Sequence, residues 1–320
     1  MTTEPASSSS LIVRRYRPYR ERARREAVVR LLAELRDDAL PVDSYAERLE
    51  ASGGGLWVVW EEATDVAVAL AEIEGLPGLP ELFELGGGVS QVWRRRGVGR
   101  FFWGELRESL PAAGIHHLEV AVPTPGAQTF LEVLGFWEGH RELSLRLSLA
   151  APAGLKAPDA GLTLRTLPAP EAIGTLRALY EGSFAGHPWH QPYEDDAAVA
   201  EWLQAAADIL FLCFAEEPIG FVWLQPQGDG RTVQLEPVGL LPAWQGRGWG
   251  RYLLLAALAE AYRRGFRIAE IGVWAENEVA LGLYRSVGFR PVAERLFMRV
   301  DLPSSPWGGL LDRGGSGSSG

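Results

Sequence analysis

The sequence of 320 residues has little of two reactive residue types: it contains one cysteine, Cys213, and one lysine, Lys156. A single cysteine cannot form an intrachain disulfide, and its position in the apolar segment 209–214 indicates a small buried side chain on a strand. The sequence also lacks an apolar run of 18 residues, and residues 1–10 contain no signal-peptide core. We therefore expect a cytoplasmic protein with no membrane partner.

Positive charge is also scarce, since the formal net charge is −10. A general nucleic-acid binder needs a basic face for the phosphates, so no nucleic-acid partner is expected. With 47% hydrophobic and 22% charged residues, the composition is typical of globular domains. The chain exceeds the roughly 100–150 residues most common for one domain, so two domains are expected.

An internal repeat divides the chain. Residues 89–99 (VSQVWRRRGVG) align without gaps with residues 240–250 (LLPAWQGRGWG), and the two loops lie 151 residues apart. Downstream, VLGF at 133–136 matches SVGF at 286–289. This duplication predicts five segments: a disordered N-terminus at 1–10, a first domain at 11–150, a linker rich in alanine, proline and glycine at 151–161, a second domain at 162–303, and a flexible tail at 304–320.

Hydrophobic periodicity in the second copy alternates between strand and helix patterns. Expected strands cover 162–167, 209–215, 219–225, 232–241, 268–274 and a terminal pair at 290–302; expected helices cover 171–184, 195–206, 248–264 and 277–287. This order is typical of an α/β domain (α+β, with a mixed sheet).

The loop QGRGWG at 245–250 joins a strand to a helix. Its glycines allow backbone N–H groups to face an anion, the helix N-terminus adds a positive dipole end, and Arg247 and Arg251 add charge. A glycine-rich turn without a ligand would look similar. A dinucleotide-binding loop would instead follow the first strand, whereas this loop follows the fourth.

The loop Q/R-x-x-G-x-G/A, followed by a strand and then N-x-x-A-x-x-L-Y-x-x-x-G-F, resembles the signature of the GNAT superfamily of acyl-CoA-dependent N-acyltransferases. The second copy carries this signature between residues 162 and 302, at Gln245, Gly248, Gly250, Asn277, Ala280, Leu283, Tyr284, Gly288 and Phe289. The tandem arrangement and the segment 184–188 (FAGHP) also resemble, to a lesser degree, two-domain acetyltransferases of the mycothiol synthase type.

The resemblance implies acetyl-CoA as co-substrate, two parted strands that hold the cofactor, and no metal. Proline at position 237 fits such a parting, because proline cannot donate to a ladder. The implied cofactor-binding residues are Val238, Gly239, Leu240, Gln245, Gly246, Arg247, Gly248, Trp249, Gly250, Arg251, Asn277 and Tyr284.

Two residues of the second copy fit acid–base roles under the same resemblance. Glu236 is the candidate base that deprotonates the amine, directly or through a water, and Tyr284 is the candidate acid that protonates the leaving thiolate. A salt-bridged strand carboxylate and a packing tyrosine are the alternatives. Asn277 fits both a helix N-cap and a contact to CoA.

A pair of histidines, His187 and His190, lies in HPWHQP, a segment that lines the acceptor site in the GNAT superfamily. They are candidate substrate contacts, although paired loop histidines are also common surface residues. No third ligand accompanies them, so the pattern does not indicate a metal site.

The first copy departs from the signature. Thr124, Leu131 and Leu85 stand where the second copy has Asn277, Tyr284 and Glu236. Its loop is more basic and is a possible second CoA site, made of Arg94, Arg95, Arg96, Gly97, Val98 and Gly99. We therefore expect a degenerate first domain that does not catalyse.

The sequence thus predicts an N-acetyltransferase that moves an acetyl group from acetyl-CoA to the primary amine of a small molecule, in the second domain, as a monomer or homodimer. Two alternatives stay open: a non-catalytic acyl-CoA-binding or regulatory protein, and a peptide or protein N-terminal acetyltransferase.

Overall fold

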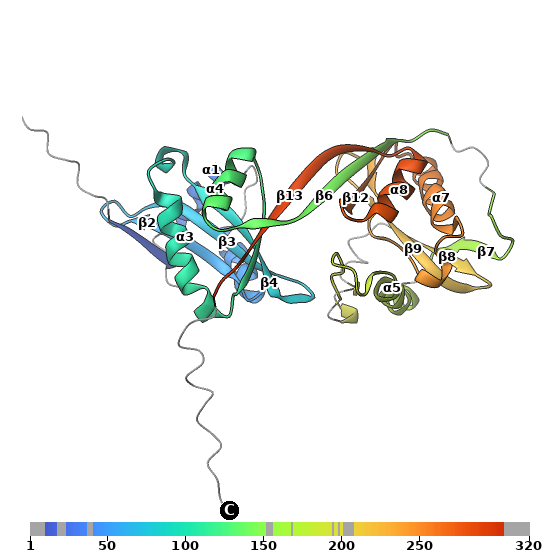
Figure 1. Ribbon diagram of the computed structural model, residues 1–320, viewed down its shortest axis with the longest axis horizontal. Helices are drawn as coiled ribbons and strands as arrows, with labels where there is room; N and C mark the ends of the chain where they lie inside the picture. The colour runs from blue at the N-terminus through green and yellow to red at the C-terminus, as the bar shows by residue number, and fades with distance from the viewer. Residues whose placement is uncertain are drawn as a thin grey trace, which may run out of the picture. The chain divides into compact units, whose positions relative to one another are not determined.

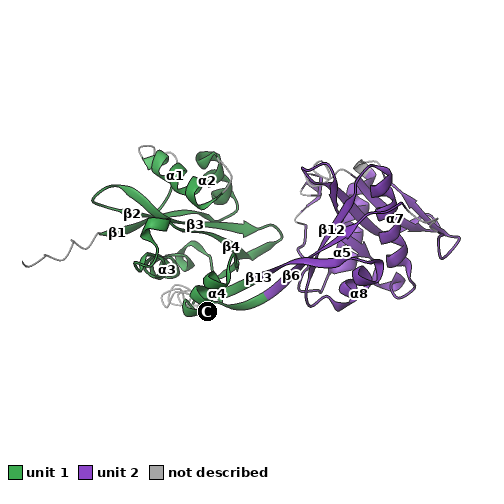
Figure 2. Ribbon diagram, turned by 90° about the horizontal axis from the view of Figure 1, so that it is seen from above, with its two compact units in different colours: residues 1–139, 297–320 green, residues 140–296 purple. Residues whose placement is uncertain are grey.

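A computed structural model describes residues 10–17, 24–36, 41–151, 156–167, 169–193, 195–197, 199–200 and 208–303. The two expected tails lie outside these residues, apart from Ser10, as do 152–155 of the expected linker and residues 198 and 201–206 of the helix expected at 195–206. The chain forms two compact units: unit 1 contains residues 1–139 and 297–320, and unit 2 contains residues 140–296 (Figure 2).

Unit 1 is a mixed sheet with helices (Figure 1). Its strands are β1 (Leu11–Arg15), β2 (Gly55–Glu61), β3 (Val66–Leu76), β4 (Leu79–Val89), β5 (His117–Ala121) and the last part of β13 (Arg290–Asp301). Its helices are α1 (Arg25–Leu35), α2 (Val42–Ala51), α3 (Val98–Ser109) and α4 (Pro125–Val133). Buried side chains of α1 and α2, such as Leu32 and Leu49, pack with Trp60 and Leu70 of β2 and β3.

Unit 2 has the same kind of architecture. Its strands are β6 (Trp137–Ser148), β7 (Leu162–Arg165), β8 (Asp208–Phe214), β9 (Glu217–Pro226), β10 (Thr232–Gln234), β11 (Val238–Leu240) and β12 (Ile268–Trp274), and its helices are α5 (Ala169–Phe184), α7 (Trp249–Arg263) and α8 (Glu278–Val287). The mixed α/β fold expected from the sequence is confirmed.

Alternate residues of the central strands of unit 2 pack on different helices, because successive strand side chains point to opposite faces. Val222 and Leu224 of β9 belong to the same core as Leu254 of α7, whereas Phe221 and Trp223 belong to a second core with Leu176 of α5. Helix α5 therefore covers one face of the sheet, and α7 covers the other.

The strand expected at 232–241 is wrong in its interior. Two short strands, β10 and β11, replace it, and Leu235–Pro237 between them is not in a strand. β10 pairs in parallel with β12, from Thr232 opposite Ile268 to Gln234 opposite Glu270, whereas β11 pairs with β9. Proline has no N–H to donate, which explains a break at this point. The expected separation of segment 232–241 from the strand at 268–274 is confirmed, because its pairing with β12 stops after Gln234.

The last strand of each sequence copy completes the sheet of the other unit. Residues Glu142–Ser148 of β6, from the first copy, pair with β12, and residues Phe297–Asp301 of β13, from the second copy, pair with β5. The sequence analysis did not anticipate this exchange. The terminal strand pair expected at 290–302 is also wrong, since these residues form one strand, β13.

The strand exchange predicts that a core substitution in β6 destabilises unit 2. Leu145 is 0% exposed and packs in the core that contains α7 and β12. We expect Leu145→Ala to lower the free energy of unfolding of that unit by about 2–5 kcal/mol through the cavity it leaves. Hydrogen exchange followed by mass spectrometry should show faster exchange in α7 and β12, but not in α1 and α2.

Ser148→Ala, at an exposed position of the same strand, is the control and should leave exchange unchanged. Loss of protection in α1 and α2 instead would contradict the assignment of β6 to unit 2.

Candidate functional site

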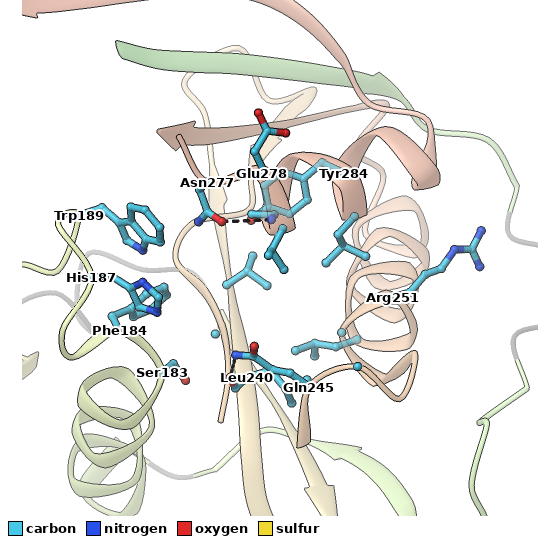
Figure 3. A pocket seen from close by; sticks show the side chains of 18 of the residues that line it. Ser183, Phe184, His187, Trp189, Leu240, Gln245, Arg251, Asn277, Glu278 and Tyr284 are labelled. Atoms are coloured by element: carbon cyan, nitrogen blue, oxygen red, sulfur yellow. Dashed lines mark hydrogen bonds between the residues drawn. The ribbon is translucent and has the colours of Figure 1, made fainter. Parts of the chain in front are cut away.

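A cavity of about 440 Å³ opens in unit 2 between the end of α5, β11, the loop before α7, and α8 (Figure 3). Ten of the twelve expected cofactor residues line it: Val238, Gly239, Leu240, Gln245, Gly246, Gly248, Gly250, Arg251, Asn277 and Tyr284. Three segments that are separate in sequence, at 183–189, 238–251 and 276–284, thus share one pocket.

The loop at 245–250 has the backbone that an anion site requires. Gly246 and Gly248 have φ angles of 74° and 80°, which glycine adopts without strain, and α7 begins directly after Gly248. The Gln245 side chain donates to the carbonyl of Leu240 at 2.8 Å and so ties the loop to β11. The first turn of α7 therefore lies at the Gln245 end of the pocket, where its N–H groups are available to an anion.

Two expected cofactor residues do not line the pocket. Trp249 is 5% exposed and stacks on Trp244 at a centroid distance of 5.0 Å. The guanidinium of Arg247 lies over the rings of Trp244 and Trp249, at 5.2 and 5.4 Å from their centroids. Both residues brace the loop, and the cation–π contacts hold Arg247 against the indoles.

Helix α8 contributes Asn277 and Tyr284 to one wall (Figure 3). The Asn277 side chain accepts a hydrogen bond from the N–H of Ala280 at 3.1 Å, which confirms the expected N-cap. Tyr284 is 6% exposed. Burial, and after it the charge of Glu236, raises the pKa of its hydroxyl above the ordinary value, so this group keeps its proton at neutral pH.

Glu236 lies beside the pocket rather than in its lining. It follows β10, and its carboxylate packs against the backbone of Gly272 in β12, where an added Cβ would meet Oε2 at 2.8 Å. Burial is the main cause that raises the pKa of Glu236, with a further rise from Glu142 and opposing hydrogen bonds from Gln234 and the Gly272 backbone. A carboxyl with a raised pKa is a suitable base near neutral pH.

Only one of the two candidate histidines reaches the pocket. His187 lines it and stacks on Trp189, with ring centroids 4.6 Å apart and planes at 10° (Figure 3). His190 instead lies 3.0 Å from a carboxylate oxygen of Glu181, so it serves the packing of α5.

The sequence analysis missed other lining residues: Ser183, Phe184, Trp189, Leu253, Glu276, Glu278, Val279, Ala280 and Leu283. The residues at 276–283 lie inside the matched signature and could have been inferred from helical spacing around Tyr284. Ser183 and Phe184 end α5, and no local pattern connects them to the loop.

Unit 1 has a loop of the same shape. Gly97 has a φ of 84°, and α3 starts at the next residue. The strand before the loop, β4, pairs with β5 only from Leu82 to Glu84 and then continues along β3 alone. Thr124 caps α4 by accepting from the N–H of Ala127 at 3.2 Å, as expected. Leu131 is 8% exposed, so an apolar side chain is buried at the position that corresponds to Tyr284.

Two kinds of feature are absent from the described part of the chain. None of its helices combines the length and the apolar character needed to cross a membrane. Among the same residues, no three His, Cys, Asp or Glu side chains gather in a way that could hold a metal ion.

Comparisons with known proteins give the family. The model of the acetyltransferase (GNAT) family matches residues 174–289. A mycothiol acetyltransferase of Rhodococcus erythropolis is 30% identical over 270 residues, which cover 79% of this chain and 87% of that protein.

Solved structures share the fold. A GCN5-related N-acetyltransferase from Sphaerobacter thermophilus superposes with a TM-score of 0.66 at 21% identity, over 91% of this chain and 96% of its own. A tandem GNAT protein from the clavulanic acid biosynthesis pathway gives 0.62 at 18% identity, over 92% and 100%. The chain therefore belongs to the GNAT family and is an acetyl-CoA-dependent N-acetyltransferase with a tandem GNAT fold.

Proposed function

We propose that unit 2 transfers the acetyl group of acetyl-CoA to the primary amine of a small molecule, with Glu236 as base and Tyr284 as acid. The observation that carries this proposal is one pocket that joins the loop before α7 to the buried Tyr284, with the partly buried carboxyl of Glu236 beside it.

In this proposal the pyrophosphate of CoA binds at the start of α7. The glycine backbone of residues 246–250 and the helix dipole attract the phosphates, and Arg251 adds a charge-assisted contact. The pantetheine arm runs along β11, which pairs with β9 on one edge and has parted from β12 on the other. An extended ligand with amides can pair with such an edge as an added strand.

The chemistry then needs three proton transfers. The acceptor ammonium loses a proton to Glu236 through a bridging water, because the carboxyl does not line the pocket. The neutral amine attacks the thioester carbonyl, the C–N bond forms, and the C–S bond breaks. The leaving thiolate takes the proton of Tyr284, and the attacking nitrogen gives up its second proton, which restores the Tyr284 hydroxyl. The products are an acetamide, the CoA thiol and the proton held by Glu236.

The acceptor enters beside Phe184, His187 and Trp189, at the end of the pocket that the loop before α7 does not occupy. Relatives named mycothiol acetyltransferase support a small-molecule amine, and their acceptor is the first one to test. Peptides with a free N-terminus belong in the same panel, because family membership does not choose the acceptor.

Unit 1, in this proposal, does not catalyse. Its loop could hold a CoA phosphate at Arg94–Gly99, but Leu85 and Leu131 provide neither a base nor an acid. The titration of acetyl-CoA by calorimetry tests this second site directly, since it counts one or two bound molecules per chain.

Glu236→Gln removes the base with little change in volume. We expect kcat to fall by about 10²–10⁴-fold, the usual contribution of a general base, while the Kd for acetyl-CoA stays unchanged. The measurement is thiol release with acetyl-CoA and the amine panel. Full activity would exclude Glu236 as the base, and no turnover of any amine by the wild type would favour the non-catalytic alternative.

Tyr284→Phe removes the hydroxyl and keeps the buried ring. We expect a loss of kcat of about 10²-fold or more, since an unprotonated thiolate is a poorer leaving group, with an unchanged KM for acetyl-CoA. Tyr262→Phe, near the end of α7, is the control. Equal activity of both variants would show that Tyr284 only packs α8.

Arg251 and Arg100 offer a matched pair, because they occupy the same place after the loop in the two copies. If only unit 2 catalyses, Arg251→Ala should raise the KM for acetyl-CoA about tenfold, the loss expected for one charge-assisted hydrogen bond. Arg100→Ala should leave the steady-state constants at wild-type values. The reverse pattern would place catalysis in unit 1.

A further inference from the structure

Three glutamines surround Glu236, and we call Gln225, Gln227 and Gln234 the glutamine cluster. The Gln234 amide donates to Oε2 of Glu236 at 2.7 Å, and the Gln225 amide donates to the main-chain carbonyl of Glu236 at 2.6 Å. Gln227 contacts the other side of Gln234, with its Nε2 at 3.4 Å from Oε1. The cluster therefore orients both the carboxylate and the backbone of Glu236.

The exchanged strand β6 brings a second carboxylate to the same face of the sheet. In the antiparallel pair of β12 and β6, Gly272 lies opposite Ser144, and Trp274 lies opposite Glu142. Side chains two residues apart on a strand share a face, and the Glu236 carboxylate rests on Gly272. Glu142 is thus the diagonal cross-strand neighbour of Gly272, the residue on which the Glu236 carboxylate lies.

We propose that Gln234 and Glu142 are positioning residues for acetyl transfer: Gln234 holds the Glu236 carboxylate by a hydrogen bond, and Glu142 opposes its negative charge from the adjacent strand. This inference rests on the proposed role of Glu236 as base. Neither residue needs to touch a substrate, since both act through Glu236.

The two neighbours act on Glu236 in opposite directions. A donor to the carboxylate stabilises the charged form and lowers the pKa of Glu236, whereas a like charge raises it. Among the described residues, Tyr284 of α8 and Tyr180 of α5 are further titratable groups that interact with Glu236, and burial raises the pKa of both hydroxyls. His140 of β6 is a further titratable group nearby, with its Nε2 at 3.8 Å from Oε1 of Glu142.

Unit 1 has neither the glutamine nor the carboxylate at the corresponding positions. At the spacing of 151 residues that relates the two loops, Phe83 stands in place of Gln234 and Leu85 in place of Glu236. Phe83 is buried, at 7% exposure. The glutamine and the carboxylate are thus absent together from unit 1, which agrees with a role for Gln234 in positioning Glu236.

The test is the pH dependence of kcat/KM, whose acidic limb reports the ionisation of the base in the free enzyme. Gln234→Leu should move this limb to higher pH by about one unit, and Glu142→Gln should move it to lower pH by up to about one unit. At a pH below the wild-type limb, Glu142→Gln should therefore be more active than the wild type. Structural damage does not produce such a gain.

Two further variants control the experiment. Gln227→Leu, which removes the support of Gln234, should shift the limb in the same direction as Gln234→Leu but by less, and it decides the issue if Gln234→Leu does not fold. Glu217→Gln removes an exposed carboxylate at the start of β9 and should leave the profile unchanged.

Glu236→Gln in the same assay tests the proposed base separately from the proposed positioning residues. If that variant keeps full activity, the proposed base is wrong. If it is inactive but the glutamine variants and Glu142→Gln keep the wild-type limb, the base stands and the positioning roles are overturned.

Discussion

Parallel pairing between β10 and β12 ends at Gln234 and Glu270, and the site of unit 2 depends on that end. Beyond it, β11 continues along β9 alone, so an edge of backbone becomes available next to the start of α7. The same break turns Glu236 toward Gly272 instead of continuing a strand. The open edge of β11 and the place of the Glu236 carboxyl thus both result from one interruption of a strand.

The two units share the strand and loop geometry but differ at the positions of the proposed acid–base groups. Unit 1 keeps the short parallel pairing, the loop with a left-handed glycine, and a capped helix at Thr124. Leu85 and Leu131 nevertheless occupy the places of the two proposed acid–base groups. A fold that binds an anion by its backbone does not specify a reaction, which depends on a few side chains.

The loop and its helix were predictable because their signals are local. Gly248 and the apolar residues of α7, such as Leu254 and Ala257, follow turn and helix spacing within one segment. Half of the pocket lining followed from the motif for the same reason. The break at Leu235–Pro237 was less visible, since the apolar pattern of 232–241 continues across it and only the proline indicates where pairing stops.

The exchange of β6 and β13 could not be predicted, because a strand's alternation fixes which face is buried but not which sheet it joins. Both strands carry the same kind of pattern, so either would fit beside β5 or β12. Glu142 and Trp189 were missed for this reason: their places beside the site depend on pairing and packing between distant segments.

The exchange also sets an order for folding during synthesis. Unit 2 has its whole sequence once residue 296 has left the ribosome, but β5 of unit 1 waits for residues 297–301, which follow all of unit 2 in the sequence. Until then β5 presents an open edge of unpaired backbone groups, a site where other strands can add. The half of the protein that is made first is therefore the half that is finished last.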